Sequence, residues 1–96
     1  MLDLANTPVD DDIISTIAAR CGQSLVALRL KGCTKLTPVA MDALVKYCEA
    51  LEFLSVWEDA PEAALLKLHG FGYRLEHLDL SQCKHLSDKV LKVRLK

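Results

Sequence analysis

The residues best suited to metal or thiol chemistry in this sequence are four cysteines and three histidines. Only Lys84 separates Cys83 from His85, but these two ligands alone cannot complete a tetrahedral zinc site, and the sequence has no C-x-x-C pair. A thiol- or zinc-dependent function is therefore a minor alternative, which stoichiometric zinc in the purified protein would support. We expect neither a metal nor a cofactor.

Nucleophilic catalysis needs a hydroxyl or thiol within hydrogen-bond reach of a base. His77 and Asp79 are predicted on one strand face, where Ser55 and Ser81 are the nearest hydroxyls and have no activating context. The segment Gly70-Phe71-Gly72 lacks the further glycine and the Lys-Ser/Thr pair of a phosphate-binding loop. The sequence therefore predicts a protein that is not an enzyme.

Composition and charge narrow the class of protein. The chain has 96 residues, of which 51% are hydrophobic and 26% charged, as expected for one globular domain. Its formal net charge of -1 makes nucleic acid an unlikely partner and gives no attraction to anionic membranes. No apolar run approaches the roughly 20 residues of a membrane helix, and the N-terminus lacks a secretory signal. We expect an intracellular protein, cytoplasmic or nuclear.

The same short pattern recurs along the chain. Leu28, Leu54 and Leu78 each begin an L-x-L or L-x-V triplet, and Leu2 begins an earlier one, so the steps are 26, 26 and 24 residues. A leucine three residues before each of the last three triplets completes L-x-x-L-x-L, a pattern typical of solenoids built from one strand and one helix per repeat. We predict an α/β solenoid with a curved parallel sheet inside and helices outside. It is one segment, 1–96, with repeats of approximately 1–24, 25–50, 51–74 and 75–96.

Apolar stripes and capping residues predict the helices. The stripe that starts at Ile13 recurs 27 residues later from Ala40, with the same helical offsets. Thr37-Pro38 is an N-cap followed by proline, and Asp59 to Glu62 has the spacing of a capping box. We expect helices near 10–21, 38–48, 61–69 and 88–95, and strands near Leu2–Leu4, Ala27–Lys31, Phe53–Trp57 and His77–Ser81.

The cysteines are predicted to be structural. Cys33 and Cys83 each follow the last strand leucine by three residues, where a buried, weakly polar side chain can bond to loop backbone groups. Thr7 stands at this place in the first repeat. Cys21 and Cys48 close the two helix stripes and are expected in the core. Disulfides are not expected, because cysteines two strands apart or on adjacent helices are too far from each other.

Residues 25–37 and 75–88 carry a family resemblance. The segment Leu25 to Thr37 resembles the cysteine-containing class of leucine-rich repeat, and Leu75 to Asp88 matches it equally well. That class is known from the substrate-binding regions of F-box/leucine-rich-repeat proteins, the receptors of Skp–cullin–F-box ubiquitin ligases. We call the cysteines three residues after the last strand leucine, such as Cys33 and Cys83, the ladder cysteines. This sequence departs from the pattern in the third repeat, where Asp59 stands at the ladder position. It also lacks the first leucine of the first motif and contains no F-box, so we expect a fragment of a longer solenoid.

The outward side chains of the strands form the candidate binding surface. Strand side chains alternate, so the residues between the inward leucines point outward and stack in columns, which places aromatic and cationic groups together. Such groups are typical of protein-binding hot spots. The alternative is that Phe53 and Trp57 only cover neighbouring strands while Arg29 pairs with Asp3. The predicted protein-binding face consists of Arg29, Lys31, Phe53, Ser55, Trp57, His77 and Asp79.

These patterns together predict a protein-interaction module. Its partner would bind on the concave strand face, and the resemblance implies substrate recognition for a Skp–cullin–F-box ubiquitin ligase. Contact with the Skp/cullin machinery would then depend on an F-box outside these residues. The alternative is a scaffolding leucine-rich-repeat adaptor unconnected with ubiquitin, and an F-box in the parent transcript would decide against it.

Overall fold

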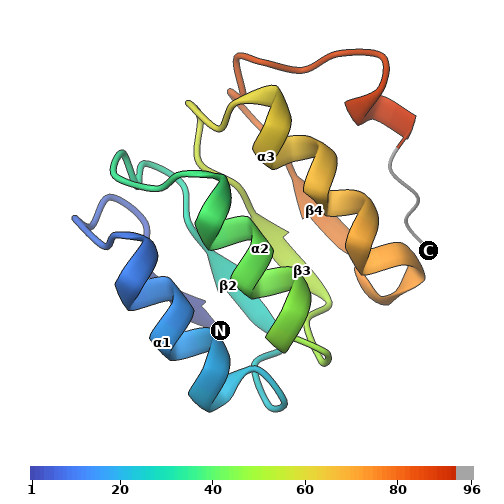
Figure 1. The fold of residues 1–96 in the computed structure, drawn as a ribbon. Coiled ribbons are helices and arrows are strands. Elements are labelled where there is room, and N and C mark those ends of the chain that lie inside the picture. The colour runs from blue at the N-terminus through green and yellow to red at the C-terminus, as the bar shows by residue number, and fades with distance from the viewer. Residues whose placement is uncertain (93–96) are drawn as a thin grey trace.

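The computed structural model describes residues 1–92 as a four-stranded parallel sheet with helices on one of its faces (Figure 1). The strands lie in chain order, and each connection between neighbours crosses the same face. The mixed α/β class predicted from the sequence is confirmed. The strands are β1 (Leu2–Asp3), β2 (Ala27–Arg29), β3 (Phe53–Ser55) and β4 (His77–Asp79).

The register of the sheet follows the leucine pattern. Leu28 pairs with Leu2 on one side and with Leu54 on the other, and Leu54 pairs with Leu78. The strands end earlier than expected, but single bonds continue the ladder: the Leu30 N–H donates to the Ser55 carbonyl at 2.8 Å. The residues one period apart are therefore direct neighbours across the sheet.

Two helices begin within one residue of their predicted starts. In α1 (Asp11–Cys21), the Asp10 carboxylate accepts from the Ile13 N–H at 3.0 Å. In α2 (Pro38–Tyr47), the Thr37 hydroxyl accepts from the Val39 N–H at 3.3 Å. Each side chain satisfies one of the N–H groups that a first helical turn leaves without a partner.

The third helix differs from its prediction. The α3 helix (Glu62–Leu66) follows Pro61 and has no side-chain cap, so the expected capping box is wrong. Because Pro61 fixes the start of the helix three residues after Asp59, the aspartate is too early to cap it. The chain then tightens into a 3₁₀ stretch, η1 (Lys67–Arg74), in which Gly72 has a φ of 56°. Glycine adopts this left-handed conformation readily, which ends the helix.

The fourth helical segment is also shorter than expected. Within the described residues it is a single 3₁₀ turn, η2 (Val90–Lys92), whereas the sequence predicts a helix over 88–95. The remainder of that prediction, residues 93–96, lies outside the described part of the chain. The turn contacts α3, and the Val90 side chain is buried.

The core lies between the sheet and the helix layer. Figure 1 shows α1, α2 and α3 side by side across one face of the sheet. The inward strand residues Leu28 and Leu54 are almost fully buried there, together with Leu44 from α2 and Leu65 from α3. Removing this apolar surface from water is the main contribution to stability. None of the helices within residues 1–92 is long and apolar enough to cross a bilayer.

Candidate protein-binding face

The side of the sheet that carries none of the described helices is the predicted binding face, and we call it the open face. The strand pairing confirms the first two of the expected columns, and in the first of them Phe53 lies between Ala27 and His77. The second column runs through Asp3, Arg29, Ser55 and Asp79. The open face consists of Asp3, Ala27, Arg29, Lys31, Phe53, Ser55, His77 and Asp79.

Arg29 on this face is held by its neighbour in the column. Its Nη1 lies 3.2 Å from Asp3 Oδ2, and both side chains are nearly half exposed. The ion pair that the sequence offered as the alternative to a binding role for Arg29 is therefore present. Exposed pairs of this kind contribute about 0–1 kcal/mol, so Arg29 can exchange Asp3 for a partner's carboxylate at little cost.

Asp79 is the second charged group that local bonds hold in place. The Ser81 N–H donates to Asp79 Oδ1 at 2.8 Å. Hydrogen bonds from the Ser81 hydroxyl and N–H lower the pKa of Asp79, and the charges of Lys31 and Arg29 lower it further. The carboxylate is thus anionic and oriented at neutral pH, with two cations near it on the same face.

Ser55 does not contribute to the exposed part of the face. It is only 1% exposed, although the sequence predicts it as a contact residue. Its register partners are Arg29 and Asp79, whose longer side chains flank the small serine on both sides. The prediction that Ser55 is available to a partner is wrong for this reason.

Trp57 lies in the core and not on the open face. The sequence predicts that it projects outward, yet it is only 1% exposed and belongs to the core. Within the described residues its Nε1 is buried and has no hydrogen-bond partner. Unlike most buried tryptophans, it therefore keeps an unsatisfied donor inside the protein.

The turn after β3 explains why Trp57 is buried. After β2, the Cys33 N–H donates to the Leu30 carbonyl at 3.1 Å. After β3, the corresponding bond runs from the Ala60 N–H to the Trp57 carbonyl at 3.3 Å, one residue later at both ends. Because strand side chains alternate, one additional residue before the turn changes the face to which a side chain points.

The other turns resemble the one after β2. The residue four positions after the first leucine of the strand triplet (Leu2, Leu28 or Leu78) has a left-handed φ in three of the four units. These angles are 60° at Asn6, 78° at Gly32 and 68° at Gln82. Glu58 stands at this position in the third turn and does not have a positive φ. The third turn is therefore the exception, and Ala60 rather than Asp59 takes the place of a ladder cysteine.

The predicted bonds of Cys33 and Cys83 to loop backbone groups are confirmed. The Cys33 thiol donates to the Leu4 carbonyl at 3.1 Å, and the Thr7 hydroxyl donates to the same carbonyl at 2.6 Å. The Cys83 thiol lies 3.6 Å from the Trp57 carbonyl, which accepts its bond as the Leu4 carbonyl accepts that of Cys33. These side chains bind loop carbonyls of the same or the preceding unit.

The two helix cysteines differ from each other. Cys48 is fully buried, and desolvation raises the pKa of its thiol to about 11. Cys21, at the end of the equivalent stripe on α1, is exposed, so its predicted place in the core is wrong. The difference arises because α1 covers α2, whereas no described element covers the opposite side of α1. All four cysteines are free thiols.

Two acidic residues that the sequence analysis did not single out connect successive units. Glu58 Oε1 accepts from the Gly32 N–H at 2.9 Å, and Asp11 Oδ1 accepts from the Thr37 N–H at 2.9 Å. The Asp11 carboxylate also accepts from the Thr37 hydroxyl. Both pairs are 26 residues apart, the period of the strand leucines. Searching for complementary groups one period apart would have found them.

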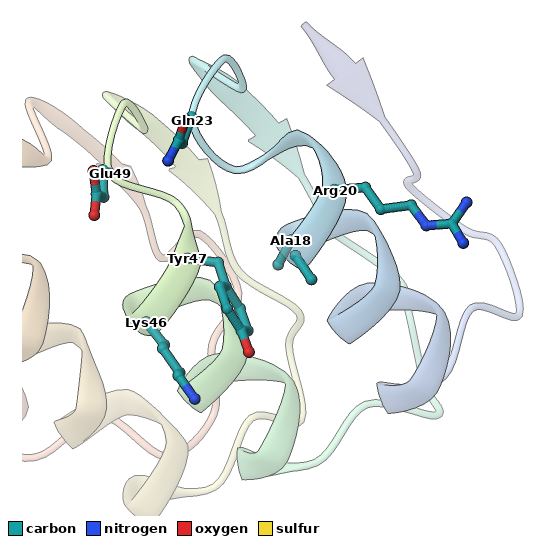
Figure 2. Close-up of a pocket in the computed structure, with 7 residues that line it drawn as sticks. Ala18, Arg20, Gln23, Lys46, Tyr47 and Glu49 are labelled. Atoms are coloured by element: carbon teal, nitrogen blue, oxygen red, sulfur yellow. The ribbon is translucent and has the colours of Figure 1, made fainter.

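Away from the open face, a hollow of about 290 Å³ lies where α1 and α2 end. Figure 2 shows Tyr47 pointing from α2 toward α1, with Lys46, Gln23 and Glu49 around the opening. Lys46 lies over the Tyr47 ring at 5.1 Å from its centre. Charges of both signs line this hollow, so it selects no single class of ligand.

Five of the predicted face residues remain accessible to solvent on the open face. His77 is exposed, while Arg29, Lys31, Phe53 and Asp79 are partly exposed. Within residues 1–92, His, Cys, Asp and Glu side chains form no group of three that could hold a metal ion. A search against models of known protein families finds none that matches this chain.

Proposed function

We propose that this chain is a segment of a leucine-rich-repeat solenoid that binds a protein through the open face of its sheet. The observation that carries the proposal is a sheet face without helices, on which the strand of Phe53 lies between a strand that leads into two cations, Arg29 and Lys31, and a strand with His77 and Asp79. Aromatic and arginine side chains supply much of the energy of protein interfaces. A parallel sheet with its strands in chain order and in leucine register is also the arrangement that such repeats require.

The chemistry of the face indicates what it would bind. Lys31 and Arg29 favour carboxylates. At the other end of the face, the Asp79 carboxylate favours cations and hydrogen-bond donors, and the His77 ring can donate or accept a hydrogen bond. Phe53 between them needs an apolar contact. A protein segment with an acidic group, an apolar side chain and a basic or amide group in succession would match this order of chemical groups.

The finer proposal concerns ubiquitination. The likeness of residues 25–37 and 75–88 to the cysteine-containing repeat supports a role in substrate recognition for a Skp–cullin–F-box ligase. An F-box encoded in the parent transcript would support it. Binding of a partner by a protein without that domain would favour the scaffolding alternative.

A photo-crosslinking amino acid in place of His77 tests the binding face, with the same group in place of Lys46 on the helix side as the control. We expect the open-face probe to enrich a protein that the control does not. With that protein purified, Phe53→Ala should weaken binding at least about tenfold, the loss of roughly 1.4 kcal/mol.

Arg29→Ala should weaken the same complex less, and its effect should decrease as salt rises. Circular-dichroism melts of each variant separate loss of contact from loss of fold. If Phe53→Ala and Arg29→Ala bind like the parent while Lys46→Ala abolishes binding, the open face is not the binding surface.

A further inference from the structure

The outer side of α1, facing away from α2, is apolar and uncovered. A shallow hollow of about 260 Å³ lies on it, lined by Asp12, Ile13, Thr16 and Ile17. Ile13 is 45% exposed, and the Thr16 hydroxyl turns back to donate to the Asp12 carbonyl at 2.9 Å. This hydroxyl bond leaves the hollow apolar, with the exposed Ile13 side chain as part of its lining.

The equivalent residues of α2 show what such a face does in this fold. They lie 27 positions later in the chain, on the helix against which α1 packs. Ile13 corresponds to Ala40, which is fully buried, and Ile17 corresponds to Leu44, which is 1% exposed. The outer side of α1 is thus a helix-packing face without its helix among the described residues.

Charges at the two ends of this face identify the helix that fits it. Asp12 lies in the first turn of α1, and Figure 2 shows Arg20 in the last turn pointing away from α2. Asp10 caps the helix and Asp11 binds Thr37, so these two carboxylates are occupied. Neither Asp12 nor Arg20 has an ion-pair partner within residues 1–92.

We propose that a second copy of this chain covers the face, with the two α1 helices antiparallel about a twofold axis near Thr16. Asp12 and Arg20 are eight residues apart, about 12 Å along the helix, with Thr16 midway. A twofold axis there places each Asp12 opposite the partner's Arg20 and buries Ile13 and Ile17 of both copies. Antiparallel helices also oppose their dipoles favourably.

The charge pattern favours the antiparallel over the parallel arrangement of two copies. A parallel copy of α1 would place Asp12 beside Asp12 and Arg20 beside Arg20, which is repulsive at both ends. The apolar area on one helix is small, so the dimer is weak and forms at high concentration. Its ion pairs are exposed, so salt weakens it.

Sedimentation equilibrium of the whole chain over a range of concentrations tests the proposal. We expect a monomer–dimer equilibrium in the parent protein. Asp12→Arg and Arg20→Asp should each weaken self-association at least about tenfold, because each places like charges opposite each other twice. Mixing the two single variants should restore dimers, since the mixed pair brings opposite charges together at both contacts.

Two controls keep the result specific. Lys35→Glu changes an exposed charge outside this face and should leave the equilibrium unchanged. Arg29→Ala, on the open face, should also leave it unchanged, which separates this proposal from the proposed binding function. A chain that stays monomeric at millimolar concentration overturns the proposal. Dimers that are insensitive to both charge changes overturn it as well, because they would form through another surface such as the edge of β1.

Discussion

The turns after β2 and β3 begin from the same strand pattern and end differently. Leu28-Arg29-Leu30 and Leu54-Ser55-Val56 are in register, and each continues the ladder with one further bond. After that point, the third turn closes one residue later than the second. One residue is enough to move a tryptophan from the predicted binding face into the core, because the side-chain direction alternates at every step.

The irregular third turn keeps a hydrogen bond to the regular second turn. In the second unit, Gly32 takes the left-handed position and its N–H binds the Glu58 carboxylate of the third unit. In the third unit, Glu58 supplies that acceptor, and it has no left-handed φ of its own. The side chain of the irregular turn thus completes the backbone bonding of the regular one.

The largest expected effect is that of Trp57→Ala. The side chain is buried, so its removal should leave a cavity and lower the free energy of unfolding by about 3–5 kcal/mol. Phe53→Ala is the matched control and should cost clearly less, because Phe53 is only partly buried on the open face. Urea unfolding of both variants measures the difference. Equal effects at the two positions would show that Trp57 is not a core residue.

Glycine substitutions at equivalent positions should have opposite effects on stability in the two kinds of turn. Gln82 has a φ of 68°, so Gln82→Gly should relieve strain and raise stability by up to about 1 kcal/mol. Glu58→Gly should lower stability by about 1–2 kcal/mol, since it removes the acceptor for the Gly32 N–H and frees the unfolded chain. Thermal melts give both values. A stabilising Glu58→Gly would mean that the third turn has the geometry of the others.

Alanine at the ladder position should distinguish Cys33 from Asp59, the residue that aligns with it in the third unit. Cys33→Ala should cost about 1 kcal/mol, because the thiol is buried and bound to the Leu4 carbonyl. Asp59→Ala should change stability by less than that, since Asp59 makes only an exposed ion pair with Lys84 at 3.2 Å. A larger loss for Asp59→Ala in chemical unfolding would contradict the shifted turn.

The smallest expected effect is a pH dependence from the turn after β4. The pKa of Asp79 is lowered in the folded protein, so its contribution to stability is present above its unfolded pKa, near the ordinary value of 3.8. That contribution is lost as pH falls through the lower folded pKa. Asp79→Asn should therefore lose less stability than the parent between pH 5 and 2, as measured by urea midpoints across that interval. Ser55 offers no such carboxylate in the third unit, so Ser55→Ala should keep the acid sensitivity of the parent.

Much of the architecture was predictable because it rests on short-range patterns. The period of the leucines correctly predicted which strand residues pair, and the cap at Thr37 correctly predicted where α2 begins. The roles of Cys33 and Cys83 at loop carbonyls also follow from their place after the strand. Each of these depends on neighbours in the chain or on residues one period away.

The errors fall where two segments compete for the same space. Ser55 was counted as exposed because alternation gives a direction, but its burial depends on the sizes of Arg29 and Asp79 on the adjacent strands. The match between the helix stripe of Cys21 and that of Cys48 predicts Cys21 in the core, yet α2 has described helices on both of its sides and α1 on only one. Burial is a property of neighbours, so a pattern within one element cannot fix it.

The sequence by itself determined the repeating strand and helix scheme, the register of the sheet and the structural use of the ladder cysteines. Hydrophobic periodicity and capping chemistry are local and act the same way in every unit. Only the tertiary structure decided that Trp57 lies inside, that Glu58 and Asp11 bind across units, and that no element of residues 1–92 covers the outer side of α1. These outcomes depend on how a turn one residue longer is accommodated between two neighbours, which is settled by packing and backbone hydrogen bonds across the whole fold.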